Sequence, residues 1–215
     1  MNYDIITDSS SNLPEEIINK YALPILPFKY FMDGVEYEVK PIATPLEREA
    51  FFSAMRIKVE VKTSLVNYDA FSKAFEKVLA EGRDVLYIGM AAGISGTFAN
   101  ASMAADELRE KYPERRIELV DTMNASLGEG LPVMAALKMR EDGAPLDAVV
   151  TMLKDMIPHQ RGCFMVDDIM FLHRTGRVSG VKAFACKALG LRPLLKGDDT
   201  GHIVMCGKAR GKNAA

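Results

Sequence analysis

Residues 84–97, DVLYIGMAAGISGT, decide the fold of this 215-residue chain. After Asp84 the run to Met90 is continuously apolar, as is typical of a strand buried on both faces of a sheet. A glycine-rich turn follows, and the next segment repeats apolar residues at helical spacing: Phe98, Ala101, Ala105, Leu108 and Tyr112. A strand, a turn and a helix in this order predict one unit of a parallel sheet covered by helices.

The same alternation extends over most of the chain. Strand patterns at Tyr3 to Thr7 and Ile117 to Asp121 alternate with helical patterns at residues 70–79, 125–139 and 145–157. We therefore expect an α/β fold whose N-terminal domain holds a parallel sheet with helices on both faces. A short helix after the first strand is expected to take Asn12 as its N-cap.

Three smaller patterns lie between the first strand and residue 70. Runs at residues 25–31 and 35–39 flank Asp33-Gly34, which suits the positive φ angles of a type I′ hairpin turn. Thr44-Pro45-Leu46-Glu47 combines a capping box with proline at the first helical position, and predicts a helix to Met55. Thr63-Ser64 precedes the next helix, so either hydroxyl is a helix cap or a ligand donor.

The pattern changes beyond His159, which predicts two domains, 1–160 and 161–215. The second is expected to be a smaller α/β domain. It opens with a strand at residues 163–166, a helix at 168–174 and the tight turn Arg174-Thr175-Gly176-Arg177. A hairpin is expected over residues 194–206, and residues 208–215 read as basic and unpatterned.

The composition argues against several classes of protein. Lys and Arg number 27 against 29 Asp and Glu, so no basic stripe suits a nucleic acid partner. No apolar run approaches the roughly 20 residues that cross a bilayer, so we expect no stable membrane insertion. Three cysteines without CxxC spacing and three histidines without HExxH spacing predict a cytoplasmic protein with no bound metal. Neither GxxxxGK[ST] nor GxGxxG appears, so no nucleotide cofactor is indicated.

The turn at residues 93–97 is the strongest candidate for a binding site. The first N–H groups of a helix have no backbone partner, and the helix dipole adds positive charge there, so the turn attracts anions. Ser95 and Thr97 add hydroxyl donors, although either could simply cap the helix. Arg177 and Arg174 are candidate counter-charges for a carboxylate or phosphate, or residues of a solvated turn.

A serine hydrolase is the alternative for the same turn, because residues 93–97 nearly spell the G-x-S-x-G nucleophile elbow. Thr97 stands where the elbow has its last glycine. A nucleophilic Ser95 also requires a histidine base and a carboxylate, for which His159 or His173 with Asp121 satisfy the chain order.

Four segments together resemble the DegV family of bacterial fatty-acid-binding proteins. They are Thr7-Asp8-Ser9-Ser10, Thr63-Ser64, Ser95-Gly96-Thr97-Phe98, and residues 171–179, FLHRTGRVS. Their order and intervals match the family, and the resemblance spans nearly the whole chain.

This resemblance implies a two-domain protein that encloses one long-chain fatty acid between its domains. The carboxylate would meet Thr63, Ser95 and Arg177, with Ser64, Gly96 and Thr97 supporting the loop. Members of the family that partner a fatty acid kinase present this carboxylate for phosphorylation by a separate subunit. The resemblance therefore implies a non-catalytic carrier in phospholipid metabolism, with a fatty acid as ligand.

The chain departs from the family pattern in several places. Leu65-Val66 replace a usual Gln-Pro, Phe98 replaces a common tyrosine, and Ala91-Ala92 stand where serines are frequent. Family chains usually continue through further elements of the second domain, including a histidine that His202 does not match. We therefore expect the C-terminal domain to be incomplete, and a non-binding, truncated paralogue is a third hypothesis.

Overall fold

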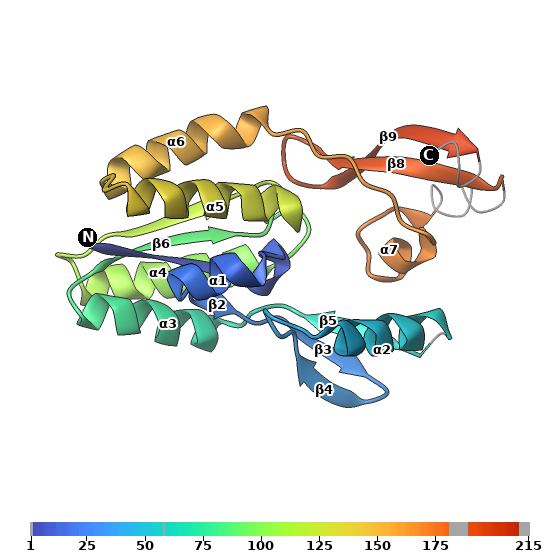
Figure 1. Ribbon diagram of the computed structural model, residues 1–215, viewed down its shortest axis with the longest axis horizontal. Coiled ribbons are helices and arrows are strands. Elements are labelled where there is room, and N and C mark those ends of the chain that lie inside the picture. The colour runs from blue at the N-terminus through green and yellow to red at the C-terminus, as the bar shows by residue number, and fades with distance from the viewer. Residues whose placement is uncertain (1, 58, 181–188, 211–215) are drawn as a thin grey trace.

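A computed structural model describes residues 2–57, 59–180 and 189–210 of the chain (Figure 1). At its centre is a parallel sheet of four strands in the order β2-β1-β6-β7. The strands are β1 (Tyr3–Asp8), β2 (Ile25–Leu26), β6 (Asp84–Gly89) and β7 (Ile117–Asp121). The α/β fold class and the parallel sheet are confirmed, and four of the six β6 residues are apolar and buried, as the apolar run predicted.

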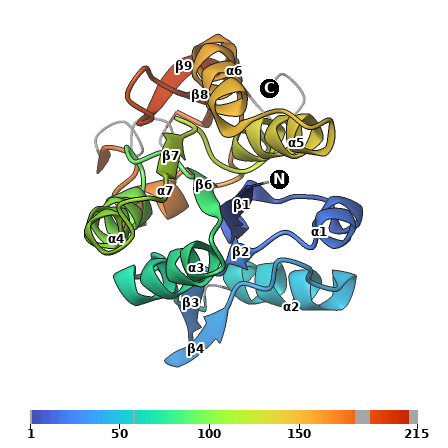
Figure 2. The same ribbon diagram turned by 90° about the vertical axis from the view of Figure 1, so that its left-hand side faces the viewer.

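Helices cover both faces of this sheet, as expected (Figures 1 and 2). One face packs against α3 (Tyr68–Ala80) and α4 (Thr97–Lys111), and the other against α1 (Glu15–Tyr21), α5 (Leu127–Glu141) and α6 (Leu146–His159). The two cores share no side chain, because successive residues of a strand point to opposite faces: Ile5 belongs to one core and Ile6 to the other.

The prediction that Asn12 caps a helix is wrong. Residues Ser9–Ser11 form a short 3-10 helix, η1, and Asn12 ends it in the left-handed conformation, with φ of 47°. Asparagine tolerates this region better than most residues. Pro14 is the N-cap of α1 instead, and its carbonyl accepts the N–H groups of Ile17 and Ile18.

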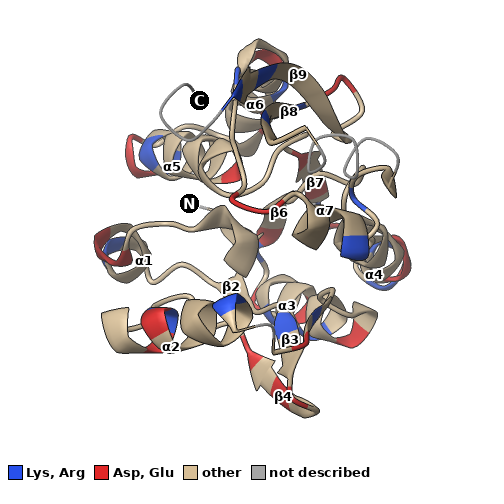
Figure 3. Ribbon diagram, turned by 90° about the vertical axis from the view of Figure 1, so that its right-hand side faces the viewer, with Lys and Arg blue, Asp and Glu red and all other residues tan. Residues whose placement is uncertain are grey.

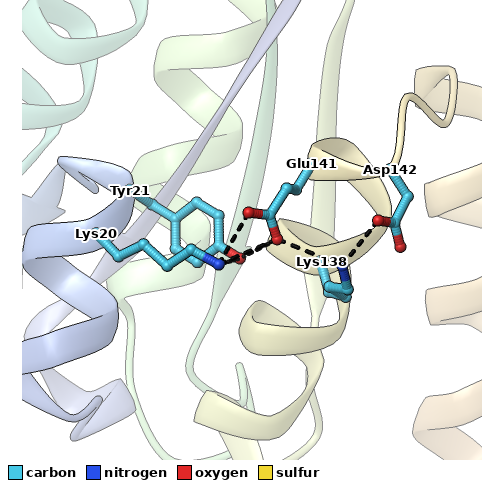
Figure 4. Close-up of polar contacts among 5 residues, drawn as sticks. All are labelled: Lys20, Tyr21, Lys138, Glu141 and Asp142. Atoms are coloured by element: carbon cyan, nitrogen blue, oxygen red, sulfur yellow. Dashed lines mark hydrogen bonds and ion pairs between the residues drawn. The ribbon is translucent and has the colours of Figure 1, made fainter.

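A charged network joins α1 to α5 on the surface (Figure 4). Glu141 accepts a hydrogen bond from the Tyr21 hydroxyl at 2.8 Å and pairs with Lys20 at 2.8 Å, while Lys138 bridges Glu141 and Asp142. The hydrogen bonds from Lys20 and Tyr21 lower the pKa of Glu141 to about 2. The network lies in solvent, where such pairs contribute little to stability.

A second, antiparallel sheet lies beside the carboxyl end of the first. Its strand order is β4 (Val35–Glu38), β3 (Lys29–Met32) and β5 (Val61–Ser64), with α2 (Pro45–Arg56) alongside. The hairpin turn at Asp33-Gly34 is confirmed by φ angles of 52° and 78°. The capping box of α2 is confirmed as well.

Neither Thr63 nor Ser64 is a helix cap. Both belong to β5, where Thr63 pairs with Tyr30 across the sheet. Asn67 caps α3, and its side chain accepts the N–H of Ala70 at 2.9 Å. Pairing with β3 creates this strand, and local sequence carries no signal of a partner some thirty residues away.

A C-terminal lobe, residues 161–180 and 189–210, follows α6. It contains α7 (Met170–Arg174) and the expected hairpin of β8 (Leu191–Gly197) and β9 (Ile203–Arg210). The predicted strand at residues 163–166 is reduced to one bridge, Phe164 to Leu195. Residues 208–210 are not unpatterned but continue β9, while 211–215 lie outside the described residues. The domain boundary near residue 160 stays a prediction.

Candidate anion site at the carboxyl end of the sheet

The loop between β6 and α4 is held in place by hydrogen bonds to the end of β7 and the residues that follow it. Ala91 N–H donates to Asn124 O at 2.8 Å, and Ala92 N–H donates to the Asp121 carboxylate at 3.1 Å. Gly96 is the N-cap residue of α4 and offers no side chain to the helix. The first turn of α4 is thus presented at the sheet edge, which is where ligands bind in open α/β folds.

Ser95 is buried and its hydroxyl has a local partner. The Ser95 hydroxyl accepts the Thr97 N–H at 3.2 Å and lies 2.8 Å from the Thr97 hydroxyl. Ser95 therefore accepts one free N–H of the helix start. The prediction that Ser95 or Thr97 is the cap residue is wrong, because Gly96 occupies that position. When the Thr97 hydroxyl is the donor of this hydroxyl pair, the proton of the Ser95 hydroxyl is available to donate to an anion.

The two residues that follow Thr63-Ser64, Leu65 and Val66, contact the first turns of α4. A Cβ on Gly96 would lie 3.2 Å from Leu65, and Asn100 donates to Val66 O at 2.9 Å. The Thr63 side chain is exposed. Within residues 59–180 the hydrogen bonds of Ser95 go to Thr97 and none goes to Thr63.

Arg177 reaches the loop from the other lobe. Its Nε donates to Ile94 O at 3.0 Å, which joins two segments 83 residues apart. Gly176, with φ of 77°, makes the turn that places it there. Arg174 differs, since its guanidinium stacks over the Phe171 ring at 4.2 Å. Of the two candidate arginines, Arg177 is the one beside the loop.

An apolar pocket of about 160 Å³ adjoins Arg177. Its lining includes Ile169, Val178, Leu195 and Ile203, and these residues belong to the small core of the C-terminal lobe. The guanidinium thus lies between a polar loop and an apolar pocket, an arrangement that suits an amphipathic anion.

The turn of the β8-β9 hairpin also packs on the loop, a contact that the sequence interpretation missed. A Cβ on Gly93 would lie 2.4 Å from Thr200 O and 2.8 Å from His202 N. One on Gly201, which has φ of 77°, would lie 2.9 Å from Ala91 Cβ. A side chain at either position would require the backbone to move. The glycines at residues 93 and 201 are therefore the sequence feature that could have indicated this contact.

A buried pair of carboxyl groups lies at the end of β1 and was also missed. Asp8 accepts the Tyr87 hydroxyl at 2.8 Å, the Met90 N–H at 3.3 Å and the Ser10 N–H at 2.9 Å. The Ser10 hydroxyl contacts both Asp8, at 2.5 Å, and Glu129. Asp8 therefore stabilises the end of β6, where the loop to α4 begins.

The two contacts of the Ser10 hydroxyl favour a protonated Glu129. A hydroxyl has a single proton, so Ser10 can donate to only one of its two carboxyl partners, and a protonated Glu129 satisfies the other contact by donating. Burial and the nearby Asp8 raise the pKa of Glu129 well above its ordinary value. The flanking Gly130 was the sequence signal, because a Cβ there would lie 2.6 Å from Ser11 O.

A larger cavity lies away from these residues. It measures about 700 Å³ between β7, the end of α6 and the C-terminal hairpin, and its lining includes Asp121, Lys154, Arg161 and Lys196. Ser95, Thr63 and Arg177 do not line it, so its size alone does not make it the anion site. Figure 3, which views the molecule from the right-hand side of Figure 1, shows Lys and Arg interspersed with Asp and Glu along the ribbon.

Two kinds of feature are absent from the part of the chain that the structure describes. Among the described residues, no group of three or more His, Cys, Asp or Glu side chains is arranged to hold a metal ion. None of the helices over the described ranges is long and apolar enough to cross a membrane.

Fold and site define a class of protein: an α/β protein with helices on both faces of a parallel sheet, in which an arginine of the C-terminal lobe contacts the loop at the carboxyl edge of that sheet. The sequence matches the family model described as "Uncharacterised protein, DegV family" over residues 2–215. The chain belongs to the DegV family, which confirms the resemblance.

Relatives and solved structures agree with this assignment. The DegV domain-containing protein YteA of Lactococcus lactis is 33% identical over 215 residues, which are 100% of this chain and 74% of YteA. A DegV family protein from Thermus thermophilus, described by its fatty acid binding, superposes with a TM-score of 0.85 at 30% identity, over 98% of this chain and 72% of that one. A fatty acid binding DegV family protein from Streptococcus agalactiae gives 0.84 at 28% identity, over 99% and 74%.

Proposed function

We propose that this protein binds one long-chain fatty acid where its two domains, 1–160 and 161–215, meet. The carboxylate is held by Ser95, Thr63 and Arg177, while Ser64, Gly96 and Thr97 shape the loop. The observation that carries the proposal is the 3.0 Å bond from Arg177 Nε to Ile94 O, which brings a cation to the start of α4. The Thermus and Streptococcus relatives, both described as binding fatty acids, support the choice of ligand.

Two physical effects favour a carboxylate at this position. The free N–H groups and the dipole at the start of α4 attract negative charge. A guanidinium adds charge-assisted hydrogen bonds of matching planar geometry. Together they offset the cost of moving a carboxylate out of water.

The acyl chain enters the apolar pocket beside Arg177. Each buried methylene contributes about 0.8 kcal/mol. The pocket volume of about 160 Å³ is smaller than the roughly 300–1,000 Å³ usual for ligand sites. We therefore expect Val178 and Met205, which line it, to move when a long chain binds.

The protein acts as a carrier in the cytoplasm and presents the carboxylate to a separate fatty acid kinase subunit. The serine hydrolase alternative is less well supported, because the partner of the Ser95 hydroxyl is Thr97, which cannot act as a general base. A fluorophosphonate probe tests it: the carrier proposal predicts no labelling that depends on Ser95.

Titration with a fluorescent long-chain fatty acid tests the proposal. Arg177→Ala and Ser95→Ala should each weaken binding by about tenfold or more, since a hydrogen bond to a charged group contributes about 1.5–3 kcal/mol. Arg174→Ala is the matched control, because its guanidinium stacks on Phe171, and it should change affinity less than about twofold. Equal losses in Arg174→Ala and Arg177→Ala, or no binding by the wild type, would overturn the proposal.

A further inference from the structure

Two cysteines from distant parts of the chain face each other in the C-terminal lobe. Cys163 Sγ lies 3.9 Å from Cys206 Sγ, across 43 residues of sequence, and both residues are exposed. A disulfide requires about 2.05 Å between the sulfur atoms. Rotation of the two side chains can supply the difference. We propose that Cys163 and Cys206 form a reversible disulfide that links the segment after α6 to β9.

Irregular backbone places both cysteines beside the same part of β8, around Leu194 and Leu195. Gly207 pairs with Leu194 and Met205 pairs with Leu195, so Cys206 is the extra residue of a β-bulge. A bulge changes the direction of the side chain that it carries. Cys163 is held opposite, because the next residue, Phe164, exchanges two backbone hydrogen bonds of 2.9 Å with Leu195. The sulfur contact is thus fixed by backbone on both sides.

The thiols are open to a small oxidant. Both cysteines line the cavity of about 700 Å³, together with Lys154, Arg161 and Lys196. Three aspartates, Asp121, Asp198 and Asp199, also line it, so the cavity carries acidic and basic side chains in equal number. A lining of mixed charge suits a small disulfide such as oxidised glutathione, which carries both carboxylates and ammonium groups.

The reaction is thiol–disulfide exchange in two steps. One cysteine thiolate attacks a sulfur of oxidised glutathione, forms a mixed disulfide and releases one glutathione thiolate. The second cysteine thiolate attacks the protein sulfur of that mixed disulfide and releases the other glutathione thiolate. Two protein thiols are oxidised, one glutathione disulfide is reduced to two thiols, and the two protons pass to the released thiolates.

Two properties of the site predict how the bond behaves. Desolvation, and then the neighbouring Cys206 thiol, raise the pKa of Cys163, so its attack should become faster as pH rises. The bond closes a loop that contains α7 and β8, and the turn of the hairpin packs on Gly93. The disulfide should therefore raise the Tm, by about 5–10 °C.

Oxidation of the full chain, followed by thiol counting and peptide mass mapping, tests the proposal. The chain has three cysteines, and Cys186 lies outside the described residues. In the Cys186→Ser variant, oxidised glutathione should remove both thiols, yield a peptide that joins Cys163 to Cys206, and raise the Tm until dithiothreitol is added.

The matched control adds Cys163→Ser to the Cys186→Ser variant. It should form only mixed disulfides with glutathione and show no rise in Tm. Retention of two free thiols or of mixed disulfides by Cys186→Ser would overturn the proposal. So would a bond in the wild-type protein that joins Cys186 to either of the other cysteines. None of these readouts depends on fatty acid binding.

Discussion

Replacing Glu129 by glutamine should change how stability depends on pH. Burial and Asp8 raise the pKa of Glu129 above 4.5, its ordinary value in an unfolded chain. Below about pH 4.5 both the folded and the unfolded protein carry the proton, so the stabilising effect of Glu129 is complete. Above it the unfolded chain releases the proton while the folded protein retains it. The free energy of unfolding therefore falls by up to about 1.4 kcal/mol per pH unit for this one proton.

Glutamine reproduces the protonated carboxyl, because its amide N–H can donate to Ser10 as the acid does. The Glu129→Gln variant should thus lack this slope and become more stable than the wild type as pH rises. Urea unfolding of both proteins at about pH 5.5, 6.5 and 7.5 measures the difference. Glu110→Gln, at an exposed position of α4, is the matched control and should run parallel to the wild type. Parallel curves for wild type and Glu129→Gln would refute the shared-proton account of Ser10.

Three other predictions test separate parts of the structure. Gly93→Ala places a Cβ 2.4 Å from Thr200 O and should lower the free energy of unfolding, measured by urea titration, by about 1–3 kcal/mol. Gly162→Ala is its control: the nearest atom to the new Cβ lies 3.4 Å away, so the loss should be less than about 1 kcal/mol. Asn67→Ala removes the side-chain cap of α3 and should cost about 1 kcal/mol in the same assay, with a loss of a few tenths for Asn67→Gly; equal losses would argue against capping. The contacts of Glu141 lower its pKa to about 2, so their effect is present above pH 4.5 and lost as pH falls toward 2; an NMR titration that finds Glu141 with an ordinary pKa would contradict the α1–α5 network.

Periodic segments of the sequence were interpreted correctly. The apolar run of β6 and the stripes of α3 and α4 appear where their patterns placed them. Turns with specific chemistry were equally clear: Asp33-Gly34 and the capping box at Thr44 both depend on a few adjacent residues. Local information was sufficient for these elements.

Elements that depend on distant partners were not predictable in this way. Strand β5 exists because it pairs with β3. The local sequence around Thr63 does not show this pairing and is equally compatible with a helix cap. The bond from Arg177 to Ile94 and the packing of Thr200 on Gly93 join segments more than 80 residues apart. Sequence patterns identified the residue types suited to an anion, and only the fold shows which of them lie together.

A crystal structure of the protein after incubation with a long-chain fatty acid tests the central proposal most directly. We predict elongated electron density with its carboxylate within hydrogen-bonding distance of Ser95 Oγ and the Arg177 guanidinium, and with its tail beside Val178 and Leu195. Density whose polar end lies in the larger cavity near Arg161, or no density at a saturating fatty acid concentration, would contradict the account.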